Sequence, residues 1–242
     1  MIATTEDRFL GGRVALRQPE DGFRAGLDAV MLAAAVPARP GETALELGAG
    51  AGTASLCLAC RTKNLTIAGL EIDERLAGIA NANAAANGMD GRVSFTAGDV
   101  LDPPAELRRP FDHVFCNPPF HGEEGEVSPD AARARALQDG GKLAGWLVAG
   151  LKRTASGGTF TMILRADWLG DALAVLAQRG VVVFPLWPRT DAQAKRIIVQ
   201  VRNGSRARLR LLPGLVLHAA DGRYTEEADA VLRDGDALFL SA

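Results

Sequence analysis

Segments with strand character alternate with segments of helical spacing from about residue 43 onward, and this alternation restricts the fold more than any other feature of the chain. Short runs of β-branched and aliphatic residues predict strands, and the alanine-rich stretches between them predict helices. Such alternation is typical of parallel strands, because each helix carries the chain back across a face of the sheet. The sequence therefore predicts an α/β fold, a doubly wound and mostly parallel sheet of seven strands with helices on both faces.

The expected elements can be placed along the chain. Strands are predicted at residues 43–47, 66–71, 92–96, 111–116, 159–164, 181–187 and 197–201, the last two antiparallel to each other. Helices are predicted at residues 54–60, 74–87, 131–136, 142–152 and 168–179, and an earlier helix is expected to open at Asp28 as its N-cap. Gly88 and the pair Gly157-Gly158 are expected to end two of these helices. Residues 209–242 predict an appended strand pair and a short helix.

The length of the chain, 242 residues, suits one domain with a complete core. We expect a single domain over residues 1–242, with its core at residues 41–205 and additions at residues 1–40 and 206–242. The polar start lacks the pattern of a signal peptide, and the longest apolar run, residues 29–36, is too short to cross a bilayer. A cytoplasmic protein without membrane contact is expected.

The cysteines and histidines do not indicate a disulfide framework or a metal centre. Three cysteines cannot form a fully paired set. Cys57 and Cys60 form a C-x-x-C pair that occurs in redox motifs, but within a predicted helix the same spacing suits two small apolar side chains. Three histidines without clustered partners predict no metal site.

Charge is unevenly distributed along the chain. The net charge of −2 excludes a globally basic nucleic-acid binder. A basic strip nevertheless occupies residues 189–210, with the members Arg189, Lys195, Arg196, Arg202, Arg206, Arg208 and Arg210, and an acidic segment follows at residues 221–236. The basic strip is expected either to contact a polyanion or to form a solvated face with salt-bridge partners.

A glycine-rich turn joins the first predicted strand of the sheet to its helix. Gly48, Gly50 and Gly52 let the backbone approach a ligand closely. Thr53 stands where a dinucleotide-binding fingerprint carries glycine or alanine, and the turn lacks the Gly-Lys-Ser/Thr of a phosphate loop. A nucleotide without a pyrophosphate therefore fits this turn better.

Polar side chains follow the next three strands of the sheet. Glu71 ends the second strand, where an acid can accept ribose hydroxyls, and Asp99 follows the third, where it could bond an adenine amino group. Asn117-Pro118-Pro119-Phe120 follows the fourth. Prolines stop the strand and stiffen the loop, so the Asn117 side-chain oxygen and the Pro118 carbonyl become fixed acceptors beside the aromatic face of Phe120. This set suits a planar substrate that carries an NH2 group.

With these residues the chain resembles the class I S-adenosylmethionine-dependent methyltransferases over roughly residues 40–205. Residues 45–52, Leu-Glu-Leu-Gly-Ala-Gly-Ala-Gly, match the first motif of that superfamily, and residues 117–120 match the motif of members that methylate planar amines. The resemblance implies a Rossmann-like methyltransferase fold with S-adenosylmethionine as cofactor. It also implies a catalytic loop at residues 117–120 and a cofactor site formed by Glu46, Gly48, Gly50, Gly52, Glu71, Asp99 and Asn117.

A narrower resemblance extends outside the core. Residues 18–33, 187–199 and 215–226 are similar to segments of bacterial tRNA adenine-N6 methyltransferases that modify a valine tRNA beside its anticodon. Phe120 and Phe23 stand where tyrosine is common in that family, and both keep the aromatic face. The resemblance implies an RNA partner, methylated on the exocyclic N6 amine of an adenine in the anticodon loop. The substrate contacts it suggests are Arg24, Phe120, His121, Arg189, Lys195 and Arg196, with a role near the site for Asp28 as well.

Two other functions compete with this interpretation. A protein glutamine methyltransferase faces the same chemistry, but members of that family carry an N-terminal helical domain for which about 40 residues leave little room. An RNA- or cofactor-binding protein without turnover would require a damaged motif, whereas the glycines, the acids and residues 117–120 are intact. DNA adenine methylation is disfavoured because the chain has no separate target-recognition domain. The sequence does not define the oligomeric state.

Overall fold

The computed structural model describes residues 3–21, 24–119 and 142–240. Its strands are β1 (Thr4–Phe9), β2 (Val14–Pro19), β3 (Thr43–Leu47), β4 (Thr66–Glu71), β5 (Val93–Ala97), β6 (Phe111–Cys116), β7 (Thr154–Arg165), β8 (Val181–Trp187), β9 (Arg196–Arg202), β10 (Arg210–Leu211) and β11 (Leu215–Val216). Its helices are α1 (Leu27–Ala35), α2 (Thr53–Arg61), α3 (Glu74–Ala86), a helix over residues 142–153, α5 (Leu169–Leu176) and α6 (Glu226–Asp229). Short helical turns occur at η1 (Ala105–Leu107), η2 (Ala166–Trp168) and η3 (Ala230–Asp234).

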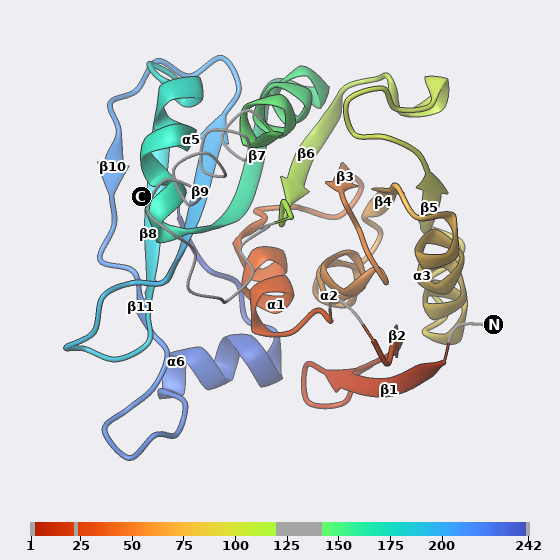
Figure 1. Ribbon diagram of the computed structural model, residues 1–242, viewed down its shortest axis with the longest axis horizontal. Coiled ribbons are helices and arrows are strands. Elements are labelled where there is room, and N and C mark those ends of the chain that lie inside the picture. Colours follow the sequence, from red (N-terminus) through yellow and green to blue (C-terminus); the bar gives the residue numbers. More distant parts are fainter. Residues whose placement is uncertain (1–2, 22–23, 120–141, 241–242) are drawn as a thin grey trace, which may run out of the picture.

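The central sheet runs in the order β10-β8-β9-β7-β6-β3-β4-β5, which Figure 1 shows from left to right, and β11 adds to β8. In the described part of the chain only β9 lies antiparallel to its neighbours in this sheet. All seven predicted strands are present, and β10 and β11 extend the sheet with two residues each. The predicted doubly wound and mostly parallel α/β fold is confirmed.

Helices cover both faces of the sheet. On one face α1 and α2 form an apolar layer with side chains such as Ala44 and Phe115. On the other face the helix over residues 142–153 and α5 pack against side chains such as Leu45 and Phe160. Neighbouring residues of β3 therefore face opposite layers, as the alternation of side chains along a strand requires. Burial on both faces explains why the central strands are almost uniformly apolar.

The glycine pair Gly157-Gly158 does not end a helix, so that prediction was wrong. The helix over residues 142–153 gives way directly to β7, and the glycines lie inside this strand, where its register with β6 shifts. Gly157 has a φ of 77°, and a Cβ at Gly158 would lie 2.5 Å from the backbone oxygen of Asp112. Glycine is needed here because the chain bends in the left-handed region and then passes close to β6.

The sequence patterns predicted the elements at the two ends of the chain only incompletely. The expected C-terminal strand pair does not form, since β10 and β11 each pair with β8 rather than with each other. At the N-terminus an antiparallel hairpin, β1 with β2, was not predicted. Asn83 of α3 and Asn87 at its C-cap hold β2 in place. Asn83 exchanges two hydrogen bonds with the backbone of Arg17, and Asn87 exchanges two with the backbone of Ala15.

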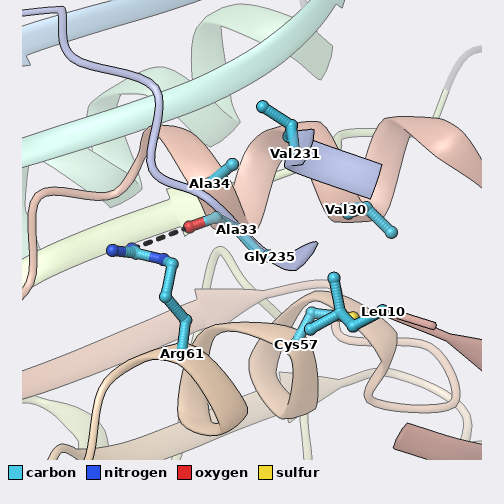
Figure 2. Close-up of a pocket in the computed structure, with 8 residues that line it drawn as sticks. All are labelled: Leu10, Val30, Ala33, Ala34, Cys57, Arg61, Val231 and Gly235. Atoms are coloured by element: carbon cyan, nitrogen blue, oxygen red, sulfur yellow. Dashed lines mark hydrogen bonds between the residues drawn. The ribbon is translucent and has the colours of Figure 1, made fainter. Parts of the chain in front are cut away.

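Cys57 lines a small cavity of about 10 Å³ between α1, α2 and the η3 region (Figure 2). Burial raises the pKa of its thiol, which therefore stays protonated and acts as a small apolar side chain. Arg61 closes the cavity with a hydrogen bond to the Ala33 carbonyl at 3.1 Å, drawn in Figure 2. The structural interpretation of the C-x-x-C pair suits this position better than a redox one. In the part of the chain that the structure describes, no helix is long and apolar enough to span a membrane.

Candidate functional site

Four predicted site segments lie along one edge of the sheet. Strands β5, β4, β3 and β6 are adjacent and parallel, so the residues after their carboxyl ends form a row. In that order the row contains Asp99, Glu71, the glycine turn and Asn117. We call this side of the sheet the carboxyl edge. Between β3 and β6 the strand order reverses direction, which is where ligands bind in open α/β sheets.

The glycine turn after β3 has a backbone that other residues rarely adopt. Gly48, Gly50 and Gly52 have φ values of 69°, 55° and 85°. Two consecutive amides at the start of the turn, those of Gly48 and Ala49, donate to the Leu70 carbonyl at 2.8 and 3.0 Å. The turn is therefore anchored to β4 before it enters α2.

The three glycines have different surroundings. A Cβ at Gly52 would lie 2.7 Å from the ring of Phe95, and a Cβ at Gly48 would lie 2.5 Å from the ring of Trp146. Among the residues that the structure describes, a Cβ at Gly50 would meet nothing within 4 Å. Packing of the protein itself thus explains the absence of a side chain at Gly48 and Gly52. At Gly50 the backbone faces open space, as it must where a ligand approaches.

Glu71 connects the glycine turn to the end of β4. One carboxylate oxygen accepts a hydrogen bond from the Gly50 amide at 2.7 Å, and the other accepts one from the Asp73 amide at 3.1 Å. The residue is only 7% exposed. A carboxylate has about four acceptor positions, so two remain for hydroxyl groups of a ligand.

Glu46 lies on β3, beneath the turn, and is buried. Its Oε2 accepts hydrogen bonds from the Ser55 amide at 3.0 Å and from the Ser55 hydroxyl at 2.5 Å. Burial raises the pKa of Glu46 to about 8, although the Ser55 hydrogen bonds lower it, and the nearby Glu71 carboxylate raises it further. A cation bound at the turn would favour the ionised form of Glu46.

Asn117 ends β6 with an unpaired acceptor. Its side-chain oxygen Oδ1 is buried and has no hydrogen-bond partner within the described residues. Pro118 beside it is buried, and Pro119 is exposed. A buried acceptor without a donor is costly, and a ligand that carries a donor group can satisfy it. Phe120 and His121, also predicted for this loop, lie outside the described residues.

Asp99 is exposed and holds its own loop, since Oδ1 accepts from the Leu101 amide at 2.9 Å. Two aliphatic side chains next to the predicted acids are also exposed, Ile72 by 74% and Leu101 by 62%. Sequence reasoning missed both, although for Ile72 its position directly after the strand-ending Glu71 is a usable signal. Exposed aliphatic groups beside hydrogen-bonding acids suit a flat, partly apolar ring such as a purine.

Trp146 is a further residue that sequence reasoning missed. It belongs to the helix over residues 142–153, is partly buried, and places its ring against Gly48. Because it is about 100 residues from the turn in sequence, no local pattern could have connected the two. Trp146 thus forms one wall of the glycine turn.

The predicted substrate residues Arg189 and Lys195 are exposed on the connection between β8 and β9. This connection follows the carboxyl end of β8, which is parallel to the central strands, so it lies at the carboxyl edge. Arg196, at the start of β9, donates from Nε to Asp28 at 2.9 Å. The prediction that Asp28 is an N-cap was wrong, because α1 has Gly26 at that position and Asp28 lies in its first turn.

The N-terminal motif residue Arg24 is engaged within the protein. Its guanidinium donates to the Asp7 carboxylate and to the Thr5 hydroxyl, both on β1. Gln18 also donates to Asp7 and exchanges two hydrogen bonds with the backbone of Ala25. These hydrogen bonds hold the residues directly before α1 against β1 and β2.

The basic strip is divided by the fold. Arg189, Lys195 and Arg196 lie at the carboxyl edge, whereas Arg202 ends β9 at the opposite edge and is followed there by Arg206 and Arg208. Arg210 on β10 donates to the Leu240 carbonyl. The acidic segment forms ion pairs of its own, Asp229 with Arg233 and Asp221 with Arg223.

The sequence profile of the methyltransferase small domain family matches residues 25–156. Among curated proteins, the tRNA1(Val) (adenine(37)-N6)-methyltransferase of Porphyromonas gingivalis is 30% identical over 234 residues, which cover 91% of each chain. The protein of the same name from Aeromonas salmonicida is 27% identical over 210 residues, or 84% of this chain and 86% of the relative.

Solved structures share the fold. A crystal structure of a predicted O-methyltransferase from Agrobacterium tumefaciens superposes with a TM-score of 0.73 at 24% identity, covering 88% of this chain and 98% of that one. TrmN from Thermus thermophilus superposes with a TM-score of 0.51 at 20% identity, covering 73% of this chain and 48% of that one. At these identities the likeness concerns the arrangement of the sheet and its helices.

Proposed function

The chain belongs to the methyltransferase small domain family, and we propose that it transfers a methyl group from S-adenosylmethionine to the exocyclic N6 amine of an adenine in RNA. Its curated relatives carry the name tRNA1(Val) (adenine(37)-N6)-methyltransferase. We therefore propose a tRNA anticodon-loop adenine as the target. In this proposal residues 41–205 are the catalytic core of a single domain, to which the hairpin and the C-terminal segment are additions.

The observation that carries the proposal is Oδ1 of Asn117, which has no hydrogen-bond partner in the part of the chain that the structure describes. This acceptor is buried at the end of β6, directly beside the glycine turn on the neighbouring strand β3. An exocyclic NH2 group is a planar donor with two hydrogens, and it can satisfy the acceptor. A hydroxyl substrate has a single hydrogen and leaves no use for the second fixed acceptor, the Pro118 carbonyl.

The residues of the turn fit the cofactor. The open space at Gly50, the remaining acceptor capacity of Glu71 and the exposed aliphatic side chains of Ile72 and Leu101 together suit an adenosine with free ribose hydroxyls. Glu71 supplies negative charge for a cationic ligand, and the positive charge of that ligand would favour the ionised form of Glu46. S-adenosylmethionine would be held by these groups and by Asp99, and when bound it supplies an activated methyl group next to Asn117.

Asn117 and Pro118 prepare the amine for attack. The lone pair of an aromatic amine is delocalised into its ring, so the nitrogen is a weak nucleophile. When Asn117 Oδ1 and the Pro118 carbonyl accept the two amine hydrogens, they favour a pyramidal nitrogen with a localised lone pair. These hydrogen bonds strengthen as positive charge develops on the nitrogen, so they stabilise the transition state more than the ground state. A strong general base is not required, because the methylated ammonium loses its proton readily.

An RNA loop is the substrate form that this site accepts most easily. The base must leave its stack to reach Asn117, and an unpaired loop base costs least to extrude. Arg189 and Lys195 are exposed cations at the same edge of the sheet, which supports the proposal because such side chains can contact the RNA backbone.

The decisive experiment is methyl transfer from labelled S-adenosylmethionine to tRNA isolated from cells that lack this protein, followed by nucleoside analysis. N6-methyladenosine at an anticodon-loop position would support the proposal. Cofactor binding without labelling of RNA would contradict it and would favour the glutamine-methylation alternative, which the same assay on protein from those cells tests. Labelled duplex DNA, included as a third substrate, would identify a DNA enzyme.

A further inference from the structure

A hollow of about 340 Å³ lies at the edge of the sheet opposite the carboxyl edge. Its walls are the turn between α5 and β8 and the turn that follows β9. The polar side chains that line it are Arg179, Arg202, Arg206, Gln178, Asn203 and Ser205, and none of the lining residues that the structure describes is acidic. Three positive charges therefore face one concave surface, and no described residue inside it compensates them.

The cations of this hollow are available to a ligand. Arg179, Arg202 and Arg206 are all exposed. Arg202 uses Nε to donate to the Gly157 carbonyl at 3.2 Å, and within the described residues its terminal nitrogens have no hydrogen-bond partner. Within the residues that the structure describes, none of the three forms an ion pair. Arginine is the side chain best suited to phosphate, because its planar group donates two parallel hydrogen bonds.

The backbone around the hollow is held in place. Asn203 donates from its amide to the Gly158 carbonyl at 2.8 Å and from its side chain to the Thr154 carbonyl at 2.7 Å. Gly180 packs so closely on Ser205 that a Cβ there would lie 2.5 Å from the serine hydroxyl. Gln178 has a φ of 61°, an uncommon value for a residue with a side chain. The two turns thus keep a fixed relation to each other before any ligand binds.

The hollow is distant from the methylation site. Arg202 and Arg196 stand at opposite ends of β9, about 20 Å apart from the usual rise of a strand. The hollow therefore cannot hold the target base or the methyl donor. The described part of its lining contains no aromatic side chain on which a base could stack. Arginine with neutral amide and hydroxyl donors is instead the composition that contacts phosphate and sugar.

We propose that this hollow binds backbone phosphates of the RNA substrate at a distance from the methylated adenine. This inference rests on the proposed function, because it assigns a second contact surface for the same RNA. A folded tRNA can reach it along the β8-β9 side of the sheet while its loop occupies the carboxyl edge, whereas a short oligonucleotide held at the loop cannot. The site adds affinity without reading sequence and favours folded RNA over isolated loops.

The test compares the double variant Arg179→Gln/Arg206→Gln with the wild-type protein. Arg202 is left unchanged because its Nε supports β7. The control is Arg17→Gln/Lys63→Gln, which removes two exposed positive charges from β2 and from the end of α2. Equilibrium binding of unmodified tRNA, and of a single-stranded oligonucleotide with the target adenine, is measured between 50 and 200 mM salt.

Loss of two phosphate contacts lowers the slope of log affinity against log salt by about 1.4–1.8. The double variant should therefore bind tRNA more weakly than wild type, and the ratio of wild-type to variant affinity should shrink about tenfold between 50 and 200 mM salt. Its affinity for the oligonucleotide should match that of wild type. An unchanged slope for tRNA, or an equal loss in the control variant, would overturn the inference. If tRNA is bound with the expected slopes but is never methylated, the proposed reaction fails and the binding surface stands.

Discussion

Arg196 and Asp28, which are 168 residues apart in the chain, are joined by a hydrogen bond of 2.9 Å from Nε to Oδ2. The bond ties the start of β9 to the first turn of α1, and both side chains are partly exposed, by 37% and 25%. Asp28 therefore offsets part of the positive charge of Arg196. Its neighbour Lys195 is exposed at the same edge, so the two cations are expected to behave differently when they are replaced.

The Arg196–Asp28 pair is expected to contribute to stability. The single variants Asp28→Asn and Arg196→Gln should each destabilise the protein, and the double variant should lose less than their sum. A partly exposed ion pair has a coupling energy of about 0.5–1 kcal/mol. Urea denaturation of the four proteins measures it, and additive effects would show that the pair is energetically neutral.

Lys195 is expected to contact RNA directly. Lys195→Gln should leave the free energy of unfolding unchanged and reduce the slope of log tRNA affinity against log salt by about 0.7–0.9, the value for one phosphate contact. Lys63→Gln removes an exposed lysine at the far end of α2 and is the matched control. A variant with the wild-type slope would assign Lys195 to a solvated face.

Asn117 is expected to act on turnover alone. Because its Oδ1 has no partner in the described residues, Asn117→Ala removes no such bond and should not lower the unfolding midpoint in urea. Loss of an acceptor that strengthens in the transition state should lower kcat by about 10²–10³-fold, while calorimetry shows unchanged cofactor affinity. Near-normal turnover in this variant would refute the catalytic role of the loop.

Gly50 is expected to lie against the cofactor. Gly50→Ala and Gly88→Ala both place alanine at a positive φ, 55° and 64°. In both positions the added Cβ meets no atom of the described residues within 4 Å. Each should cost about 1–2 kcal/mol of stability. Only Gly50→Ala should weaken binding of S-adenosylmethionine, which isothermal titration measures. Equal cofactor affinity in the two variants would show that the cofactor does not occupy the open space at Gly50.

Glu46 is expected to make the stability of the ligand-free protein depend on pH. Its pKa is about 8 in the folded protein and 4.5 in the unfolded chain, because burial disfavours the charged form. Between these values the unfolded chain has released a proton that the folded protein retains. The free energy of unfolding should therefore fall as pH rises through this window, by at most about 1.4 kcal/mol per pH unit.

Urea denaturation of wild type and Glu46→Gln between pH 5 and 8 checks this expectation. The glutamine variant cannot ionise, so its stability should decline less over the window. Glu20→Gln, which removes an exposed carboxyl group, is the charge-matched control. Parallel pH profiles for wild type and Glu46→Gln would show that the carboxyl group of Glu46 is already ionised in the folded protein.

The core of the sheet could be predicted because its signals are local. Strands β4, β6 and β8 begin and end where the sequence predicted, since each is a short apolar run bounded by turn or helix residues. The row of Glu71, Asp99 and Asn117 was predictable for a related reason. Parallel strands bring their carboxyl ends to one edge, so position relative to each strand is enough to group these residues.

Other features depend on contacts between distant segments. Gly157 and Gly158 carry the composition of a helix end, yet the close approach of Asp112 makes them part of β7. The two-residue strands β10 and β11 have no recognisable sequence pattern of their own. They form because the outer side of β8 is free to pair with them. The contact between Trp146 and Gly48 likewise joins two segments that are distant in the sequence, the helix over residues 142–153 and the turn after β3.

The order of strands and helices, the glycine turn and the polar residues at the strand ends were all encoded in patterns a few residues long, and these determined the fold class and the expected chemistry. Only the tertiary structure decided at which edge of the sheet each cation lies. Residues 189–210 form one basic strip in sequence, but β9 separates its members to opposite edges of the sheet because an extended strand carries the chain about 20 Å. Arg196 meets Asp28 at one edge, and Arg202 joins Arg179 and Arg206 around a hollow at the other.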